Sequence, residues 1–466
     1  MFVGVILAAG QGTRMKSERA KVLHEICGRP MVHYVLEASR EAGVSRHILV
    51  VGHQAEQVRE RIGEGPGIEY ALQAEQKGTG HALLQAAPLL QGYEGHVLVL
   101  CGDTPLLTAW VLRSLMDHHR ESGAAATLLV ASLENPAGYG RVLRDRNGRV
   151  IRIVEERDAG PAEAAVREIN TGIYCFRAPS VFRALHSLAP DNAQGEYYLT
   201  DVVAVLVSRG EKVETVVAGD PSVVAGINNR RQLAEVEAIM RRALLARLMD
   251  GGVTVVDPAS TYVDAGVEVG RDTILFPFTF LQGKTAVGEG CLIGPGAHLV
   301  DTLVGNRVEI RHSVVAGSRV GDGASVGPYS RIRPGSDLAP GTRIGNFAEI
   351  KNSRVGPETR ILHHSYVGDA VVGANVNIGA GVITVNYDGV KKHVTHIDDG
   401  AFVGCNSNLI APVRVGEGAY VGAGSTITQD IPSGALGLAR SRQRNILGWV
   451  ARRFADWKDN SSPGKK

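Results

Sequence analysis

The sequence predicts an α/β domain in the first half of the chain and a parallel β-helix in the second half, with a long helix between them. Strand-like and helix-like segments alternate over residues 1–228. Residues 229–252 carry the apolar spacing of an amphipathic helix. From residue 253 onward, aliphatic residues recur every six positions, a period that belongs to neither an α-helix nor a single strand.

Short apolar runs rich in β-branched residues predict the buried strands of the first part. They cover residues 3–8, 48–51, 97–100, 125–130 and 213–217. Helical patterns lie between them, at residues 56–62, 79–86 and 109–119. This alternation predicts a mostly parallel sheet with helices on both faces.

A glycine-rich turn, G-Q-G-T-R-M, follows the first predicted strand. Gly10 and Gly12 permit a sharp turn and a close backbone approach to a ligand. Arg14 and Lys21 add cations to the backbone N–H groups of the turn, a combination that binds phosphate. Because α/β sheets bind ligands at the carboxyl ends of their strands, the turn predicts a polyphosphate site. An ordinary strand-to-helix turn is the alternative.

The turn is not a known dinucleotide or P-loop motif. It lacks the third glycine of the dinucleotide-binding fingerprint, and no acidic residue follows the strand at residues 48–51. No G-K-[ST] sequence follows it either. Nicotinamide-dependent enzymes and P-loop enzymes are therefore excluded.

Two oxygen-bearing side chains are candidate metal ligands. Asp103 follows the predicted strand at residues 97–100, so its carboxylate should lie at the carboxyl end of the sheet. Asn228 offers an amide oxygen where the first domain ends. Hard cations prefer such ligands, although Asn228 could instead be the N-cap of the next helix.

Composition narrows the function classes. The chain has 50 Lys and Arg against 48 Asp and Glu, which argues against nucleic-acid binding through a strong positive field. Five scattered cysteines without a C-x-x-C pair indicate a reducing compartment and no structural zinc. We find no leader or long apolar run, so we expect a cytoplasmic protein.

The segment at residues 229–249 has apolar residues at 233, 236, 239, 240, 244 and 248. Asn228 or Asn229 can cap its start, and Gly251 and Gly252 can end it. We expect one long exposed helix, roughly 30 Å in length, that acts as a spacer between the domains.

A six-residue period marks residues 253–436. Val326, Ile332, Leu338, Ile344 and Ile350 keep it without a slip, and so do residues 409, 415, 421 and 427. Each aliphatic residue should point into a narrow prism, with about eighteen residues in each coil. A β-sandwich with glycine turns would not explain this spacing. Residues 385–402 break the period and predict a loop that leaves the coil; the tail predicts a short helix over 445–457 and a polar end.

Arg333 and Lys351 each follow an inward aliphatic residue, and the two positions are one coil apart. They should therefore stack and form a paired cation site for a phosphate. A histidine is the side chain best suited to act as a base near neutral pH. His363 lies near these cations in the predicted coils, whereas most histidines on such a surface have no catalytic role.

Together these features resemble the bacterial bifunctional enzymes that acetylate glucosamine-1-phosphate and then uridylylate the product to UDP-N-acetylglucosamine. The resemblance covers essentially the whole chain, from L-A-A-G-Q-G-T-R-M at residues 7–15 to Arg440. It implies a Rossmann-like nucleotidyltransferase domain (residues 1–228), a helical linker (229–252) and a left-handed β-helix acetyltransferase domain (253–466). It further implies a cytoplasmic homotrimer that uses Mg²⁺, acetyl-CoA and UTP and supplies precursors of peptidoglycan and lipopolysaccharide-type polymers.

The resemblance also implies the residues of the uridylyl site. The uridine and phosphate contacts are Leu7, Ala8, Ala9, Gly10, Arg14 and Lys21. The uracil-reading group is Gln73 with Gly78 and Thr79, the sugar contacts are Gly140, Glu155 and Asn170, and the metal ligands are Asp103 and Asn228. The phosphate of N-acetylglucosamine-1-phosphate would attack the α-phosphorus of UTP; because it is already an anion, it needs no base.

In the acetyl site, the resemblance makes His363 the base that takes the amine proton and Glu349 a candidate to orient it. The sugar-phosphate contacts are Arg333, Lys351, Tyr366 and Asn377. The acetyl-CoA contacts are Ala380, Asn386, Tyr387, Cys405, Ala423 and Arg440. The loop at residues 385–402 and the tail would serve an adjoining subunit of the trimer.

Three positions depart from the family pattern: Ala20 replaces a frequent proline, Cys101 a frequent tyrosine and Cys405 a serine. Cys405 raises the alternative of transfer through an acetyl-cysteine, which direct transfer to the amine does not need. Two other functions stay open: a single-activity sugar-nucleotide pyrophosphorylase with a structural β-helix, and a scaffold without catalysis. Balanced charge and few aromatic residues disfavour RNA binding.

Overall fold

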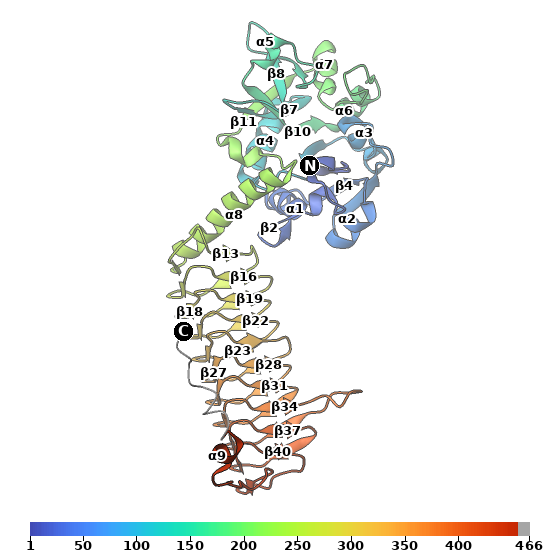
Figure 1. Cartoon of the computed structure of the whole chain (residues 1–466). Coiled ribbons are helices and arrows are strands. Elements are labelled where there is room, and N and C mark those ends of the chain that lie inside the picture. Colours follow the sequence, from blue (N-terminus) through green and yellow to red (C-terminus); the bar gives the residue numbers. More distant parts are fainter. Residues whose placement is uncertain (455–466) are drawn as a thin grey trace, which may run out of the picture. The chain divides into compact units, whose positions relative to one another are not determined.

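The computed structural model of the chain describes residues 1–454 (Figure 1). Its backbone divides into two compact units. Unit 1 comprises Met1–Arg247 and Val263–Gly266, and unit 2 comprises Leu248–Tyr262 and the described chain from Val267 onward. The predicted tail helix is shorter than expected, α9 (Trp449–Arg453). The rest of the predicted tail, residues 455–466, lies outside the described residues.

Unit 1 is built on a nine-stranded sheet. Its main path, in spatial order, is β11 (Val213–Val217), β7 (Ala126–Ser132), β10 (Glu168–Arg177), β6 (His96–Cys101), β1 (Phe2–Ala8), β4 (His47–Val51) and β5 (Ile68–Leu72). β8 (Gly140–Arg144) and β9 (Val150–Val154) branch from β10, and β2 (Glu25–Ile26) pairs with β3 (Arg29–Pro30) separately. The five predicted strands are confirmed. β10 was not predicted; it runs antiparallel to β6 and β7.

Helices cover both faces of this sheet. The α-helices of unit 1 are α1 (Met31–Glu41), α2 (Ala55–Ile62), α3 (Thr79–Leu84), α4 (Ala109–Ser122), α5 (Pro161–Ala164), α6 (Ala178–Leu185), α7 (Asp201–Ser208) and most of α8 (Arg230–Asp250). Short 3₁₀ turns lie at η1 (Thr13–Met15), η2 (Lys21–Leu23), η3 (Ala87–Leu90) and η4 (Pro221–Val224). Side chains of β1 alternate between the two cores: Ile6 packs with α1 and α4, and Val5 packs with α3, α6 and α7. The predicted layered α/β fold is confirmed.

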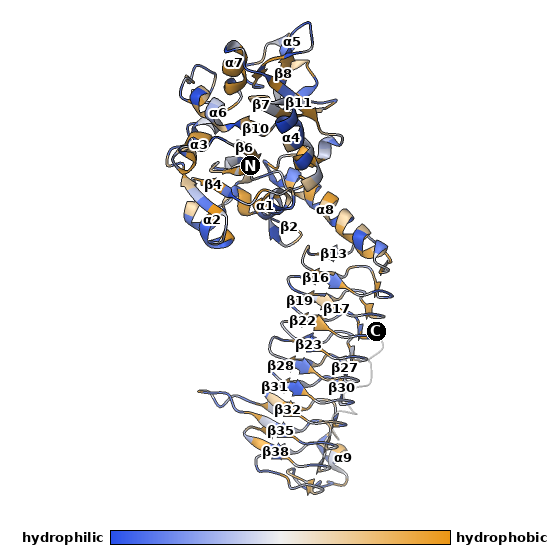
Figure 2. Ribbon diagram, turned by 180° about the vertical axis from the view of Figure 1, so that it is seen from behind, coloured by the Kyte–Doolittle hydropathy of each residue, from blue (hydrophilic) through white to orange (hydrophobic). Residues whose placement is uncertain are grey.

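Helix α8 packs more closely than predicted. Figure 2 shows both hydrophobic and hydrophilic residues along it. Val236 and Leu244 are buried in the same core as α1 and α4, and Leu233 and Met240 pack against that core. The expectation of an exposed spacer is therefore wrong for this part of the helix, because its apolar stripe is covered by unit 1.

Two buried histidines should make unit 1 sensitive to acid. His47 and His119 are 1% and 0% exposed, and burial lowers the pKa of each to about 4. The unfolded chain protonates them near 6.5, so stability falls as the pH drops from about 6.5 to about 4. We expect each to remove about 2 kcal/mol from the free energy of unfolding at about pH 5. Denaturant unfolding at about pH 7 and pH 5 measures the loss; equal stabilities would contradict it.

Unit 2 is a parallel β-helix whose coils contribute one short strand to each of three sheets. The first sheet contains β12 (Thr254–Val255), β15 (Ile274–Leu275), β18 (Leu292–Ile293), β21 (Glu309–Ile310), β24 (Ser325–Val326), β27 (Arg343–Asn346), β30 (Arg360–His363), β33 (Asn377–Ile378), β36 (Phe402–Val403), β39 (Tyr420–Val421) and β41 (Leu436–Gly437).

The second sheet contains β13 (Tyr262–Val263), β16 (Phe280–Gln282), β19 (His298–Val300), β22 (Val314–Ala316), β25 (Arg331–Ile332), β28 (Glu349–Lys351), β31 (Tyr366–Gly368), β34 (Ile383–Val385), β37 (Asn408–Ile410) and β40 (Thr426–Ile427). The third contains β14 (Glu268–Val269), β17 (Ala286–Val287), β20 (Leu303–Val304), β23 (Arg319–Val320), β26 (Asp337–Leu338), β29 (Arg354–Val355), β32 (Ala370–Val372), β35 (Thr395–Ile397) and β38 (Val413–Val415).

The six-residue period is confirmed as the inward face of this coil. Ile332 pairs with Ile350 on the next coil, and both are 0% exposed. The glycine that often follows an inward residue also has a reason: a Cβ on Gly404 would lie 2.6 Å from the backbone nitrogen of Ala423. The predicted interruption is shorter than expected, because the chain rejoins the coil at β35 after a loop over residues 386–394.

The inward-facing aliphatic residues should contribute most to the free energy of unfolding of unit 2. We expect Ile332→Ala to lower its free energy of unfolding by about 2–5 kcal/mol, because the substitution leaves a cavity in a narrow core. Arg331, its exposed neighbour on β25, is the matched control, and Arg331→Ala should change stability by about 0.5 kcal/mol or less. Urea unfolding measures both; equal losses would contradict the assignment.

Candidate functional site

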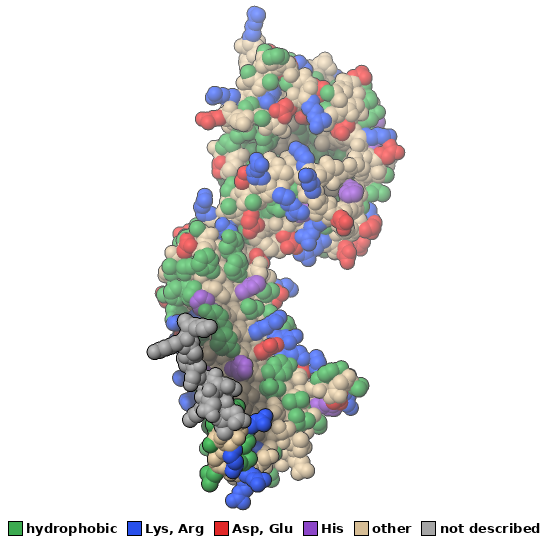
Figure 3. All heavy atoms as spheres, viewed as in Figure 1, with side chains coloured by type: hydrophobic (Ala, Val, Ile, Leu, Met, Phe, Trp, Pro, Cys, Tyr) green, Lys and Arg blue, Asp and Glu red, His purple; other side chains and the backbone are tan. Residues whose placement is uncertain are grey.

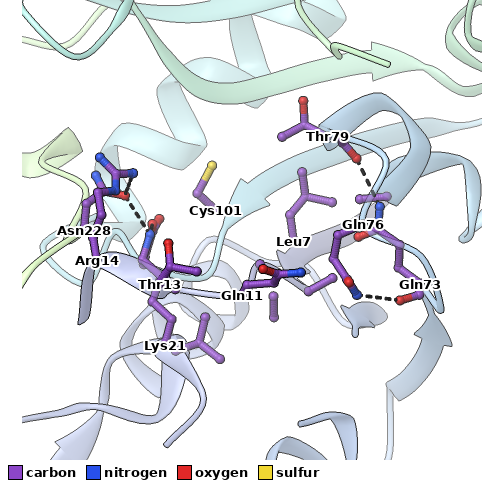
Figure 4. A pocket seen from close by; sticks show the side chains of 18 of the residues that line it. Leu7, Gln11, Thr13, Arg14, Lys21, Gln73, Gln76, Thr79, Cys101 and Asn228 are labelled. Atoms are coloured by element: carbon purple, nitrogen blue, oxygen red, sulfur yellow. Dashed lines mark hydrogen bonds and ion pairs between the residues drawn. The ribbon is translucent and has the colours of Figure 1, made fainter. Parts of the chain in front are cut away.

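A cavity of about 480 Å³ lies at the carboxyl ends of β1, β5 and β6 in unit 1 (Figure 4). β1 runs parallel to β6 and to β4, which is parallel to β5, so these ends share one edge of the sheet. Most residues predicted for the uridylyl site line it, namely Leu7, Ala8, Ala9, Gly10, Arg14, Lys21, Gln73, Gly78, Thr79, Asp103 and Asn228. Its lining also includes residues for which no role was predicted: Gln11, Thr13, Val22, Gln76, Ala82 and Glu196.

One ammonium group joins the two candidate metal ligands. Lys21 Nζ donates to Asp103 Oδ2 and, at 2.8 Å, to Asn228 Oδ1. Arg14 donates to the same Asn228 oxygen at 2.9 Å. Because two oxygens from distant segments converge on a single cation, the donor set fits a hard divalent cation.

The alternative role of Asn228 as helix cap is excluded by its neighbour. Asn229 Oδ1 accepts from the backbone N–H of Gln232 at 2.9 Å, so Asn229 caps α8. The side chain of Asn228 faces Lys21 and Arg14 instead. Within residues 1–454, no group of three or more His, Cys, Asp or Glu side chains could hold a metal.

Gly140, Glu155 and Asn170 form a separate cluster that is not among the residues lining the cavity. Gly140 pairs with Asn170 across β8 and β10, and Thr200 donates to Glu155 at 3.1 Å. Burial raises the pKa of Glu155, although the Thr200 hydrogen bond opposes this shift. Cys101, which lines the cavity, contacts the carbonyl of Gly172 near Asn170, so the cluster lies next to the cavity wall.

In unit 2, His363 belongs to a column of residues on one corner of the β-helix. Its side chain is exposed, and its Nδ1 lies 3.2 Å from Asn346 Oδ1. Each member follows an inward aliphatic residue by two positions, and these inward residues pair from coil to coil. The column is Asn346, His363, Ala380, Cys405 and Ala423.

Arg333 and Lys351 stack on consecutive coils as predicted. Each also has a carboxylate partner: Arg333 donates to Glu349 at 2.9 Å, and Lys351 donates to Asp369 at 3.3 Å. The interpretation of Glu349 as the group that orients His363 is therefore corrected, since Glu349 pairs with Arg333 and Asn346 contacts the histidine.

Asp369 accepts hydrogen bonds from three side chains on two segments of the chain. Asn352 donates to it at 2.6 Å, and Lys351 and Asn386 also donate. Burial alone would raise the pKa of Asp369, but these hydrogen bonds together lower it. Lys392, for which no role was predicted, lies beside Lys351, and the neighbouring Lys351 ammonium lowers the pKa of Lys392. Two adjacent ammonium groups favour an anion between them.

The remaining predicted residues are spread over different parts of unit 2. Tyr366 and Lys351 lie on the second sheet, and Asn386 directly follows β34 of that sheet. Asn386 Nδ2 lies 3.5 Å from the Tyr366 hydroxyl. Asn377 lies on the first sheet. Tyr387 is on the loop over residues 386–394 and is 57% exposed, and Arg440 lies exposed beyond β41. Within its own chain, Asn386 contacts Tyr366 and Asp369.

Comparisons with known proteins cover both units. The Nucleotidyl transferase family model matches residues 3–220, and the Bacterial transferase hexapeptide (six repeats) model matches residues 395–429. A protein called Bifunctional protein GlmU from Pelotomaculum thermopropionicum is 56% identical over 452 residues, which cover 97% of this chain and 98% of the relative. Its namesake from Geobacillus sp. (strain WCH70) is 52% identical over 448 residues, or 96% and 97%. The chain belongs to the GlmU family.

As a GlmU-family member, the chain is a bifunctional transferase of UDP-N-acetylglucosamine synthesis, which supplies a precursor of the bacterial cell wall. Its fold is the predicted combination of a Rossmann-like nucleotidyltransferase and a left-handed β-helix. Membership favours two activities over a single-activity pyrophosphorylase or a scaffold. A solved structure of UDP-glucose pyrophosphorylase complexed with UDP-glucose is also similar, with 17% identity and a TM-score of 0.44 over 52% of this chain and 98% of that one.

The structure places the three residues that differ from the family pattern. Ala20 is buried before η2, Cys101 lines the unit 1 cavity, and Cys405 is an exposed free thiol in the His363 column. Within residues 1–454, none of the helices combines the length and apolar content needed to cross a membrane.

Proposed function

We propose that the cavity of unit 1 is the uridylyltransferase site and that the His363 column of unit 2 is the acetyltransferase site. In this assignment, residues 1–228 carry the first activity and residues 253–466 the second, with residues 229–252 as the linker. The observation that carries it is the convergence of Asp103 and Asn228 on Lys21 beneath the glycine-rich turn. This arrangement of anionic, neutral and cationic groups suits a metal-bound polyphosphate.

Mg²⁺ is the cation that this donor set fits best. One carboxylate and one amide oxygen leave most of an octahedral shell to water and substrate phosphates, as Mg²⁺ prefers. When bound, it would neutralise charge on the phosphates of UTP. Arg14 and Lys21, released from Asn228 and Asp103, would then be free to bind phosphate oxygens.

The chain's own residues position the two reacting phosphates. Backbone N–H groups of the turn at residues 10–13 bind the triphosphate, and Gln73, Gly78 and Thr79 hold uracil. Gly140, Glu155 and Asn170, beside the cavity wall, bind the sugar. The sugar phosphate then attacks the α-phosphorus of UTP and pyrophosphate leaves, so rate depends on alignment rather than on a base.

In unit 2, His363 would accept the proton of the sugar amine. At the corner of the β-helix, His363 is in line with Ala380, Cys405 and Ala423. These small side chains would leave room along the coils for the pantetheine arm of acetyl-CoA. Tyr387 and Arg440 lie exposed on segments that leave the coil and would complete the coenzyme site.

The phosphate of glucosamine-1-phosphate would be bound by Arg333 and Lys351, with Lys392 beside them. Tyr366 and Asn377 would contact the sugar. Tyr366 lies on the second sheet and Asn377 on the first, and we propose that another copy of the chain completes the site.

A homotrimer would supply that boundary. Figure 3 shows hydrophobic side chains gathered on the surface of unit 2. Of the described residues of unit 2, Phe278, Tyr329 and Phe347 are 58–63% exposed, and the rings of Tyr329 and Phe347 stack at 5.6 Å. Exposed aromatic surface of this kind indicates an interface. All five cysteines are free, which supports a reducing cytoplasmic location, where UTP and acetyl-CoA are available.

Cys405 should not act as an acyl carrier. Direct attack of the amine on the thioester needs no enzyme nucleophile, so Cys405→Ala should retain acetyl transfer at close to the wild-type rate. Steady-state assay of free CoA release measures this. Trapping an acetylated Cys405, together with loss of turnover in the variant, would contradict direct transfer.

The function is tested by supplying glucosamine-1-phosphate, acetyl-CoA, UTP and Mg²⁺ and measuring UDP-N-acetylglucosamine. Omitting acetyl-CoA should stop its formation, and adding N-acetylglucosamine-1-phosphate should restore it. Formation of UDP-glucosamine from glucosamine-1-phosphate and UTP at a comparable rate, when acetyl-CoA is omitted, would contradict the proposed order.

A further inference from the structure

The side-chain amide of Gln73 is held in one orientation inside the unit 1 cavity. Gln73 is 3% exposed, and its Nε2 lies 3.1 Å from the carbonyl oxygen of Gly78 and 3.1 Å from Nδ1 of His81. Figure 4 shows it on the side of the cavity opposite Arg14 and Asn228. Gly78 has φ +101°, and a Cβ there would lie 2.6 Å from the carbonyl of Tyr197, so the backbone that presents this carbonyl requires glycine.

These contacts determine which end of the amide a ligand can meet. A carbonyl oxygen only accepts hydrogen bonds, so the group that faces Gly78 must be the NH₂ of Gln73. Its second proton points to His81. Both protons are then used, and among residues 1–454 no donor is seen at the Gln73 Oε1. The atom left for a bound base is therefore an acceptor.

The same contacts determine the state of His81. To accept from Gln73, its Nδ1 must carry the lone pair, so the ring is neutral with its proton on Nε2. The Gln85 amide lies 3.1 Å from that second nitrogen. Gln85 Nε2 also donates to the His81 backbone carbonyl at 3.2 Å. Because Gln85 is half-buried, it can give up this bond to solvent and turn its oxygen toward His81, whereas Gln73, at 3% exposure, has no solvent to replace its bond to the Gly78 carbonyl.

We propose that His81 is a specificity-determining positioning residue: it fixes the Gln73 amide so that only an acceptor faces the nucleobase. Uracil carries a hydrogen on N3 and satisfies this acceptor, whereas cytosine carries a lone pair on N3 and opposes it. The two bases have nearly the same shape, so hydrogen bonding must separate them. The proposal rests on the proposed uridylyl role of the cavity and of Gln73.

The test is the ratio of kcat/KM for UTP to kcat/KM for CTP. In His81→Phe the ring keeps its shape but loses the acceptor, so the Gln73 amide can turn toward either base. We expect the ratio to fall about tenfold or more, the effect of one mispaired buried polar group. A purely structural role of His81 would lower both rates and leave the ratio unchanged, which would overturn the proposal.

Two matched variants sharpen this result. His81→Asn places a carbonyl oxygen near the position of Nδ1 and should retain most of the preference for UTP. His186→Phe, an exposed histidine after α6, should leave the ratio at the wild-type value. A ratio that falls equally in the asparagine and phenylalanine variants would also overturn the proposal.

The outcome can be separated from failure of the proposed function. If Gln73→Leu leaves the use of UTP unchanged, the proposed role of Gln73 fails and this proposal fails with it. If Gln73→Leu loses the preference but His81→Phe keeps it, only the present proposal fails. Should His81→Phe not fold, ¹⁵N NMR of histidine-labelled wild-type protein decides: an unprotonated Nδ1 at His81 supports the proposal, and a proton on that nitrogen overturns it.

Discussion

His363→Ala is expected to reduce acetyl transfer to glucosamine-1-phosphate by a factor of about 10²–10⁴, the usual contribution of a general base. The amine must lose a proton as it attacks the thioester. His363 is the exposed imidazole next to the row of small residues that we propose binds acetyl-CoA. Its exposure means that the substitution should leave the β-helix core intact. Release of free CoA measures the loss.

The adjacent residue provides a control for His363. His364 is also exposed, and His364→Ala should retain acetyl transfer. Uridylyl transfer from UTP to N-acetylglucosamine-1-phosphate should be unchanged in both variants. Wild-type acetyl transfer in His363→Ala, or equal losses in the two variants, would remove His363 from the mechanism.

Asp103→Asn is expected to have a comparable effect on the other activity. The substitution keeps the shape of the side chain but removes the charge that would hold a divalent cation, and Lys21 loses its anionic partner. We expect pyrophosphate release from UTP to fall by a factor of about 10²–10³. Acetyl transfer by the same protein should be unchanged.

An exposed aspartate of the same domain is the control: it shows whether loss of a negative charge outside the site also lowers the rate. Asp117 on α4 pairs with Arg120 at the surface, and Asp117→Asn should leave pyrophosphate release at the wild-type rate. The need for added Mg²⁺ should also increase in Asp103→Asn. A variant with normal rate and normal metal requirement would contradict the assignment of Asp103.

The β-helix could be predicted in detail because its period is local and repetitive. Ile332 and Ile350 are one coil apart, so the stacking of Arg333 on Lys351 follows from counting residues. The carboxylate partners of Arg333 and Lys351 could not be predicted from the sequence in the same way. Glu349 could have faced His363 or Arg333, and only the side-chain geometry shows that it pairs with Arg333.

The α/β domain was predictable in its layers but not in every strand direction. Apolar runs identify β1, β4 and β6, yet the antiparallel course of β10 depends on a connection that carries no local signal. Similarly, the glycine turn and Asp103 mark the site, whereas Glu196 reaches the same cavity from a distant loop without a motif. The apolar stripe of α8 predicted a helix but not the surface that covers it.

We propose that one chain holds two independent reaction centres that share a diffusible intermediate. Purified His363→Ala and Asp103→Asn proteins should each fail to convert glucosamine-1-phosphate, acetyl-CoA and UTP into UDP-N-acetylglucosamine. When the two are mixed, the Asp103→Asn protein should acetylate the sugar and the His363→Ala protein should uridylylate it, so the product should appear. A mixture that stays inactive, although each protein retains its one expected activity, would contradict the account.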